Sequence, residues 1–271
     1  MIAKANFHTH TTFCDGKNTA EEMVLAAIEK GLSALGFSGH SYTFFDESYC
    51  MSKAGTREYQ KEIQHLKGLY SHKIAIYCGV EQDFYSREPI TGFDYAIGSV
   101  HYIKKEGMYL PVDEGAEIIE RDIRTLFAGN PYAYAKAYFE TVAEILETTG
   151  ADIIGHFDLL AKYNEKNPIF DAKEKGYRDC GISAMEALLP YGKPFEINTG
   201  AMYRGLRTEA YPSTDFLKEI QKRGGKILLS SDSHDCASLG YCFAEMAALA
   251  RDIGFRSRLV WTSQGFEEVG L

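Results

Sequence analysis

Six histidines and three acidic residues of this chain stand where they could bind metal ions. Each follows, or ends, a short β-rich run of the sequence. The nine residues are His8, His10, Asp15, His40, Glu81, His101, His156, Asp232 and His234. Imidazole with carboxylate suits Zn²⁺, Mn²⁺ or Fe²⁺ and is too rich in nitrogen for Mg²⁺ or Ca²⁺. At three or four protein ligands per ion, the set predicts two to three divalent transition metal ions with positions left for water.

The spacing of these residues indicates shared sites. Side chains two apart on a strand point the same way. His8 and His10 can therefore hold one ion, and Asp232 and His234 can reach the same pocket. The two other histidines of the chain fall in or near an expected helix among charged residues, and we interpret them as solvated.

The elements that must position these side chains alternate along the chain. We expect strands at residues 5–10, 34–38, 74–81, 95–101, 152–157, 194–198 and 226–231, with a last short run at 259–261. We expect helices at 19–30, 57–70, 113–127, 132–148, 180–189, 214–223 and 239–253. Thr19 and Glu22 have the spacing of a capping box. Residues up to 109 are expected to extend the fourth strand through a β-turn.

Alternating strands and helices imply an α/β fold with a parallel sheet. Seven or eight such units in 271 residues fit a closed (β/α) barrel better than an open sheet. A doubly wound sheet would normally carry a glycine-rich turn after its first strand, whereas this first strand ends in His-Thr-His. Active sites of such barrels form at the C-terminal ends of the strands.

Composition and charge exclude other classes of protein. The formal net charge of −9 argues against a nucleic-acid groove. No apolar stretch approaches the ~20 residues of a membrane helix, and the first residues lack a signal-peptide core. The six scattered cysteines contain no C-x-x-C pair and indicate reduced thiols in a cytoplasmic protein. We expect one domain over residues 1–271, without nucleic-acid or membrane partners; the oligomeric state is left open.

The motifs around the nine residues resemble those of the polymerase-and-histidinol-phosphatase (PHP) family. They are His8-x-His10 with Asp15, Gly39-His40, Gly79-Val80-Glu81, Gly98-Ser99-Val100-His101, Gly155-His156 and Ser231-Asp232-Ser233-His234. All nine metal positions of the family have an acceptable residue here, in the family's order. The resemblance implies a distorted, TIM-like (β/α)₇ barrel with a trinuclear metal centre at the C-terminal strand ends.

The resemblance also implies which residues share an ion. One ion would take His8, His10, Glu81 and Asp232. A second would take His101 and His156, with Glu81 as the bridge. A third would take Asp15, His40 and His234, although some relatives have a histidine in place of Asp15.

Two further segments, at 156–162 and 195–204, look like the histidinol-phosphate phosphatase branch of this family. This likeness implies a phosphomonoesterase that releases phosphate from L-histidinol phosphate, a step of histidine biosynthesis, through direct attack of a hydroxide that bridges the metal ions. The predicted catalytic residues are Glu81, Asp232, His234 and Asp15, the last two as candidates for handling the leaving-group proton. Arg204 is predicted to bind the phosphate, since guanidinium pairs bidentately with it. Arg207 and Lys162 are further candidates.

Three alternatives remain open on the residues alone. The substrate could be another small phosphate ester, such as a nucleotide or a sugar phosphate. An amide or lactone hydrolase on a related barrel would typically bridge its metals with a lysine, whereas Glu81 holds that position here. A non-catalytic PHP module of a DNA polymerase would be favoured by lost ligands, and none of the nine is lost.

Overall fold

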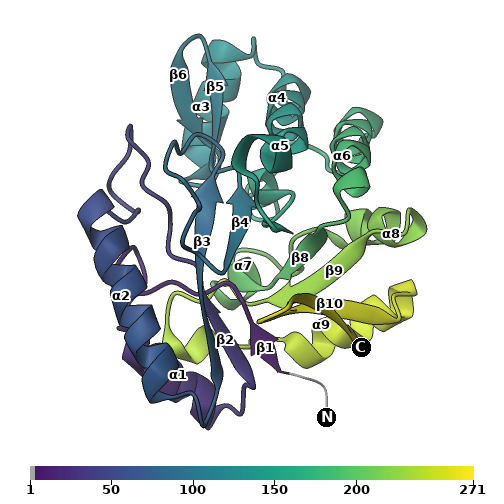
Figure 1. The fold of residues 1–271 in the computed structure, drawn as a ribbon. Helices are drawn as coiled ribbons and strands as arrows, with labels where there is room; N and C mark the ends of the chain where they lie inside the picture. Colours follow the sequence, from purple (N-terminus) through teal and green to yellow (C-terminus); the bar gives the residue numbers. More distant parts are fainter. Residues whose placement is uncertain (1–3) are drawn as a thin grey trace.

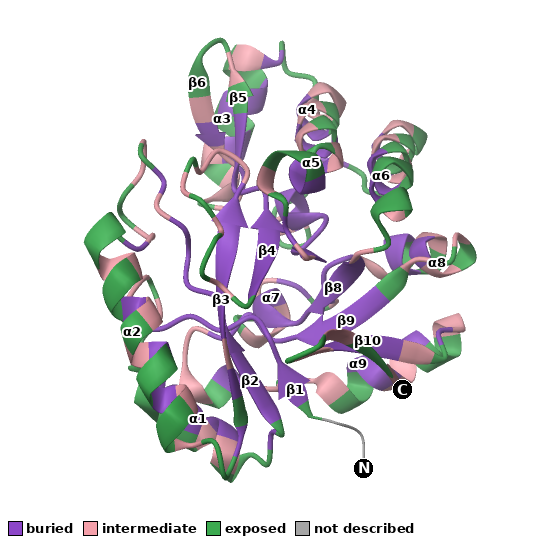
Figure 2. Cartoon of the chain, in the orientation of Figure 1, coloured by how far each residue is buried: buried purple, intermediate pink, exposed green. Residues whose placement is uncertain are grey.

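Seven parallel strands form a nearly closed barrel with helices around it in the computed structural model, which describes residues 4–271 (Figure 1). In spatial order they are β1 (Ala5–Asn6), β2 (Ala34–Phe37), β3 (Ala75–Asp83), β4 (Tyr95–Ser99), β7 (Ile153–Ile154), β8 (Pro194–Asn198) and β9 (Lys226–Ser230). The expected distorted (β/α)₇ barrel is confirmed. The strand regions are buried while the outer faces of the helices are exposed (Figure 2).

The barrel closes at the edge where the strands end. β1 and β9 are the outer strands of the sheet, and the chain just beyond them pairs in parallel at Thr9 and Ser233. The backbone N–H of His10 donates to Ser233 O at 2.8 Å, and the N–H of Ser233 donates to His8 O at 3.0 Å. This closure brings the first and last expected ligand motifs together.

Helices cover the outside of the barrel. They are α1 (Ala20–Glu29), α2 (Lys53–Leu69), α3 (Ala116–Leu126), α4 (Pro131–Ala143), α5 (Ile145–Thr149), α6 (Lys175–Leu188), α7 (Gly200–Tyr203), α8 (Thr214–Lys222) and α9 (Phe243–Ile253), with short 3₁₀ turns η1 (Leu159–Ala161), η2 (Leu189–Tyr191) and η3 (Cys236–Ser238). The capping box of Thr19 and Glu22 is present at the start of α1. Within residues 4–271, none of these helices is long and apolar enough to cross a membrane.

Several helix boundaries differ from the expectation; α2 begins at Lys53 rather than at residue 57, and α9 begins at Phe243 rather than at residue 239. The helix expected at 132–148 is interrupted at Glu144, where the chain passes from α4 to α5. The helix expected to begin at Cys180 begins at Lys175, because the side chain of Glu174 accepts from two backbone N–H groups there. The apolar pattern of this helix begins later than its cap, so periodicity alone placed its start too late.

Two hairpins stand outside the barrel sheet. β5 (Tyr102–Lys105) and β6 (Met108–Pro111) form the first, in place of the expected extension of the fourth strand. β10 (Ser257–Thr262) and β11 (Gly265–Gly270) form the second. The expected last strand is thus part of an antiparallel pair, and Figure 1 shows β10 beside β1 and β9.

The barrel interior is filled around Tyr95. Its hydroxyl donates to the carbonyl oxygens of Phe7 at 2.5 Å and Phe37 at 2.9 Å, which ties three strand regions together. A Cβ at Gly36 or Gly79 would collide with the Tyr95 ring, so both positions require the absence of a side chain. This packed plug separates the hairpin β10–β11 from the opposite edge, where the polar residues gather.

Candidate metal centre

All nine predicted ligands meet at the C-terminal ends of the barrel strands. Seven are buried, whereas Asp15 and His234 keep side-chain exposures of 34% and 23%. Asp232 holds a left-handed backbone conformation, with φ of 46°. Aspartate tolerates this conformation better than most residues. The turn at this position lets the side chains of Asp232 and His234 face the same centre.

One group of side chains surrounds the first predicted ion position. Nε2 of His8 lies 3.0 Å from Oε2 of Glu81 and 3.6 Å from Oδ1 of Asp232. Nε2 of His10 lies 3.4 and 3.3 Å from the same two oxygens. Four potential ligand atoms, from the ends of β1, β3 and β9, therefore lie around one position that could hold an ion.

Glu81 faces a second group with its other oxygen. Its Oε1 lies 2.9 Å from Nε2 of His156 and 3.3 Å from Nε2 of His101. Nδ1 of His40 approaches Oε2 at 3.1 Å. The carboxylate thus has one oxygen toward each group, as the bridging position requires.

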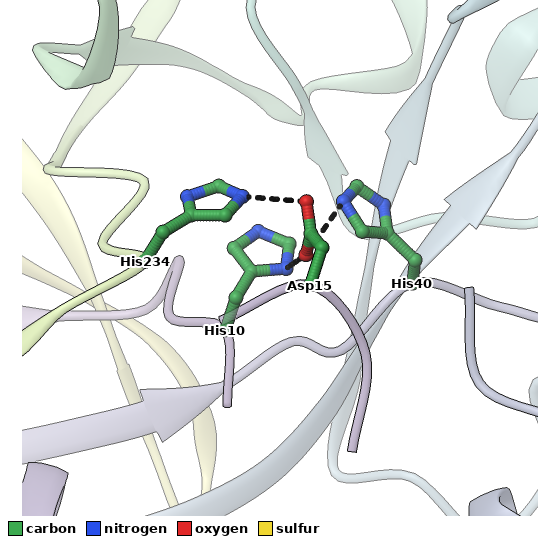
Figure 3. A group of neighbouring side chains, drawn as sticks. All are labelled: His10, Asp15, His40 and His234. Atoms are coloured by element: carbon green, nitrogen blue, oxygen red, sulfur yellow. Dashed lines mark hydrogen bonds and ion pairs between the residues drawn. The ribbon is translucent and has the colours of Figure 1, made fainter. Parts of the chain in front are cut away.

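Asp15 lies between three histidines in the third group (Figure 3). Its Oδ2 is 3.1 Å from Nε2 of His234, and its Oδ1 is 3.6 Å from Nε2 of His40. Nδ1 of His10 is also 3.6 Å from Oδ1. His10 therefore adjoins both the first and the third group, which the sequence did not predict.

Burial and mutual charge determine the ionisation of these groups in the metal-free chain. Burial opposes ionisation of Glu81, but the surrounding imidazoles, His8 foremost, hold its pKa well below the usual range. Burial also opposes ionisation of Asp232, but His8, Arg204 and the neighbouring histidines together hold its pKa well below the usual range. Burial, with the charge of His234, lowers the pKa of His10 to about 3. In contrast, neighbouring carboxylates raise the pKa values of His8 and His101 well above the usual value despite burial. Because metal ions bind the ionised carboxylate and the neutral imidazole, metal binding at these two rings would release protons.

The donor atoms fit a transition metal ion. Ligand atoms at about 2.1 Å from one tetrahedral ion lie about 3.4 Å apart, and the first group shows separations of 3.0 to 3.6 Å. Nε2 of His10 is buried without a hydrogen bond in the described chain, although two carboxylate oxygens are near. A bound ion would satisfy that atom. Within residues 4–271, three clusters have donor atoms close enough together to hold an ion: His10, Asp15, His40 and His234; His8, His10 and Asp232; and His40, Glu81 and His101. His40 therefore groups with Glu81 as well as with Asp15, and His156 lies outside these three clusters.

Two carboxylates that the sequence analysis did not assign support the histidines. Nδ1 of His8 lies 2.5 Å from Oε1 of Glu196, and Nδ1 of His101 lies 3.3 Å from Oδ2 of Asp83. Asp83 follows Glu81 by two on the same strand, so strand periodicity was a signal for it. Glu196 was visible only as a carboxylate inside a strand that is otherwise apolar.

A pocket of about 480 Å³ opens over the centre. Two of the three basic candidates for phosphate line it, Arg204 and Lys162. Nη2 of Arg204 donates to Oδ2 of Asp232 at 3.3 Å, and Nζ of Lys162 donates to Oδ2 of Asp113 at 2.9 Å. Further around the pocket stand aromatic and acidic side chains, namely Tyr49, Tyr102, Tyr203, Glu114 and Asp235.

The third basic candidate, Arg207, does not line this pocket. Its side chain is 3% exposed and lies near three carboxylates, those of Asp158 at 3.6 Å, Glu209 at 3.2 Å and Glu165 at 3.8 Å. Arg207 was predicted as a further candidate for phosphate binding, but its guanidinium is buried among these acids and does not reach the pocket.

Three ligand clusters at the C-terminal edge of a seven-stranded barrel define a protein built to bind several metal ions. A model of the PHP domain matches residues 6–200, and the chain belongs to this family. It is 30% identical over 268 residues to a Deinococcus radiodurans protein named "Probable histidinol-phosphatase", with 95% of this chain and 96% of the relative covered. A Schizosaccharomyces pombe protein with the same name is 26% identical, with 86% and 81% covered.

A solved structure has the same fold. The crystal structure of histidinol phosphate phosphatase from Lactococcus lactis, complexed with zinc, L-histidinol and phosphate, gives a TM-score of 0.73. Its sequence is 22% identical, and the match covers 98% of this chain and all of that one. The similarity supports the barrel architecture independently of the sequence motifs.

Proposed function

We propose that the chain hydrolyses L-histidinol phosphate to L-histidinol and phosphate at this centre. The observation that carries the proposal is the placement of Glu81, whose two oxygens face two different histidine groups under one pocket. The family match and the names of the two relatives support phosphomonoester hydrolysis and this particular substrate. The zinc and the histidinol described for the Lactococcus lactis protein agree with it.

The nine side chains would hold two to three divalent ions, with zinc, manganese and iron as candidates. Such ions would supply an activated water and positive charge against the phosphate oxygens. Glu81 would keep two ions close together. Asp232 and the histidines would set their positions, and no side-chain nucleophile is needed.

The residues around the centre would bind and orient the substrate. Hydrolysis forms a bond from a water oxygen to phosphorus and breaks the bond from phosphorus to the ester oxygen. Arg204 and Lys162 line the pocket, and they would bind the phosphate beside the metal ligands. The departing alkoxide takes up a proton, and we assign this transfer to the third group, His234 or Asp15, which is the most exposed of the three. Tyr49, Tyr102 and Tyr203 offer ring surfaces for the imidazole.

The experiment is a comparison of phosphate release from several phosphomonoesters. Protein reconstituted separately with Mn²⁺, Zn²⁺ and Fe²⁺ is assayed with L-histidinol phosphate, a nucleoside monophosphate, a sugar phosphate and glycerol phosphate. We expect the highest kcat/KM for L-histidinol phosphate. A higher value for any other ester would transfer the proposal to that substrate class, and no release from any ester would refute it.

A further inference from the structure

Glu196 is a charged side chain at the base of the centre that belongs to none of the metal clusters. It lies in β8 between the apolar residues Phe195 and Ile197, and it is fully buried. A carboxylate in such a place is costly unless each oxygen is well satisfied. Its partners therefore indicate what it does.

Four donors from different parts of the barrel converge on this carboxylate. Oε1 accepts from Nδ1 of His8 at 2.5 Å and from the hydroxyl of Ser230. Oε2 accepts from the backbone N–H of His156 at 2.9 Å and from Nδ2 of Asn198 at 3.0 Å. Two of these partners, His8 and His156, carry predicted ligand atoms of different metal groups.

The contacts of Glu196 determine how two rings face Glu81. With Nδ1 of His8 directed at Glu196, the opposite nitrogen, Nε2, lies 3.0 Å from Oε2 of Glu81. The backbone of His156 is held by Oε2 of Glu196, and its Nε2 lies 2.9 Å from Oε1 of Glu81. Asn198 also links Glu196 to the N–H of Gly200, at the start of the α7 turn that precedes Arg204.

We propose that Glu196 is a positioning residue of the metal centre. Its contact with Nδ1 of His8 turns the ring so that Nε2 faces Glu81, and its contact with the backbone N–H of His156 fixes the chain there. One carboxylate thereby aligns ligands of two ion positions. Carboxylates that hold the outer nitrogen of a ligating histidine typically contribute 10–100-fold to metal affinity or activity. The inference rests on the metal centre of the proposed function but not on its substrate.

The test is the zinc affinity of Glu196→Gln, measured by competition with a chromophoric chelator. A glutamine keeps the shape but places an amide N–H₂ against at least one of the four donors, so the carboxylate's arrangement cannot be reproduced. We expect 10- to 100-fold weaker zinc binding and a smaller rise of Tm on adding zinc. Asp122→Asn is the matched control, because Asp122 is a buried carboxylate on α3 that pairs with Arg121. Its zinc affinity should equal that of the wild type.

The outcomes separate the inference from the proposed function. Wild-type zinc affinity in Glu196→Gln would overturn the positioning role, because a purely structural role lowers Tm without changing affinity. Failure of the unchanged protein to bind zinc would instead count against the metal centre. If Glu196→Gln does not fold, the inference is tested by NMR of zinc-loaded wild-type protein with ¹⁵N-labelled histidine, which identifies the state of each ring nitrogen of His8. Zinc bound to Nε2 of His8 supports the inference, and zinc bound to Nδ1 overturns it.

Discussion

The carboxylate of Asp232 contacts both Arg204 and a predicted metal ligand, His10, at the edge of the pocket. Nη2 of Arg204 donates to Oδ2 at 3.3 Å, while Oδ1 of the same carboxylate lies 3.3 Å from Nε2 of His10. The guanidinium is therefore held next to the ligand set without belonging to it. A phosphate bound by Arg204 would lie directly beside the ions.

Replacing this guanidinium should reduce turnover and leave the metal content unchanged. A charge-assisted hydrogen bond contributes roughly 1.5–3 kcal/mol, so Arg204→Ala should lower kcat/KM for L-histidinol phosphate on the order of 10- to 150-fold. Arg87→Ala is the control, since Arg87 is exposed over the ring of Phe44 and should change nothing. A wild-type rate in Arg204→Ala would mean that another cation holds the phosphate, and Lys162 would be tested next.

A methyl group at Gly200 should disturb the same contact from the backbone side. Its Cβ would lie 2.8 Å from Oδ2 of Asp232 and 2.9 Å from Nη2 of Arg204. We expect Gly200→Ala to lower kcat/KM by about tenfold, comparable to losing one charge-assisted hydrogen bond. Gly68→Ala on α2, where a Cβ meets nothing within 4 Å, should instead stabilise the protein by about 0.5–1 kcal/mol. Full activity in Gly200→Ala would show that the Arg204–Asp232 contact is dispensable.

Two acidic ligands should differ in importance. Glu81→Gln removes charge from the carboxylate that faces two groups, so it should cost more than one equivalent of metal and abolish activity. Asp15→Asn touches the third group and should retain part of the activity. Elemental analysis and phosphate release measure both. Equal residual activity and equal metal loss in the two variants would contradict the bridging position of Glu81.

Removal of metal should destabilise the fold. The centre packs carboxylates and imidazoles together at the closure of the barrel, and an ion that binds only the folded state stabilises it by linkage. Protein treated with a chelator should melt at a lower temperature and recover on adding Zn²⁺ or Mn²⁺. Identical melting curves with and without metal would show that the ligands do not share a site.

Arg207 should matter for stability more than for substrate binding. Its guanidinium and Asp158 are 3% and 1% exposed, and breaking one side of such a buried pair costs about 3–5 kcal/mol. Urea unfolding of Arg207→Ala should show a loss of this size, while Lys218→Ala at an exposed ion pair should lose about 0–1 kcal/mol. Unchanged stability in Arg207→Ala, with a raised KM, would restore Arg207 as a phosphate ligand.

The sequence predicted the barrel and the nine-residue cluster because both depend on local signals. A histidine or acid after a β-rich run, as at His40 or His156, is visible in a few residues, and parallel strands bring such ends to one edge. The resemblance to the PHP family supplied the pairing of residues with ions. The structure adds that His10 lies beside Asp15 as well as Asp232.

The sequence could not show which way loop side chains turn or what they meet. Arg204 and Arg207 lie three residues apart after the same strand, yet one reaches the pocket and the other is buried among acids. Glu196 could be recognised only as a strand residue. Its contact with His8 could not be predicted, because the two residues are 188 positions apart in the sequence. Contacts of this kind form only when the barrel closes, and a local sequence pattern does not predict them.

The central claim, a multinuclear metal centre that hydrolyses L-histidinol phosphate, is tested most directly by titrating metal-free protein with Mn²⁺ or Zn²⁺ while phosphate release is followed. We predict almost no release from the metal-free protein, and activity that reaches its maximum only when two to three equivalents are bound. Release at the full rate without metal, or none at saturation, would contradict the account.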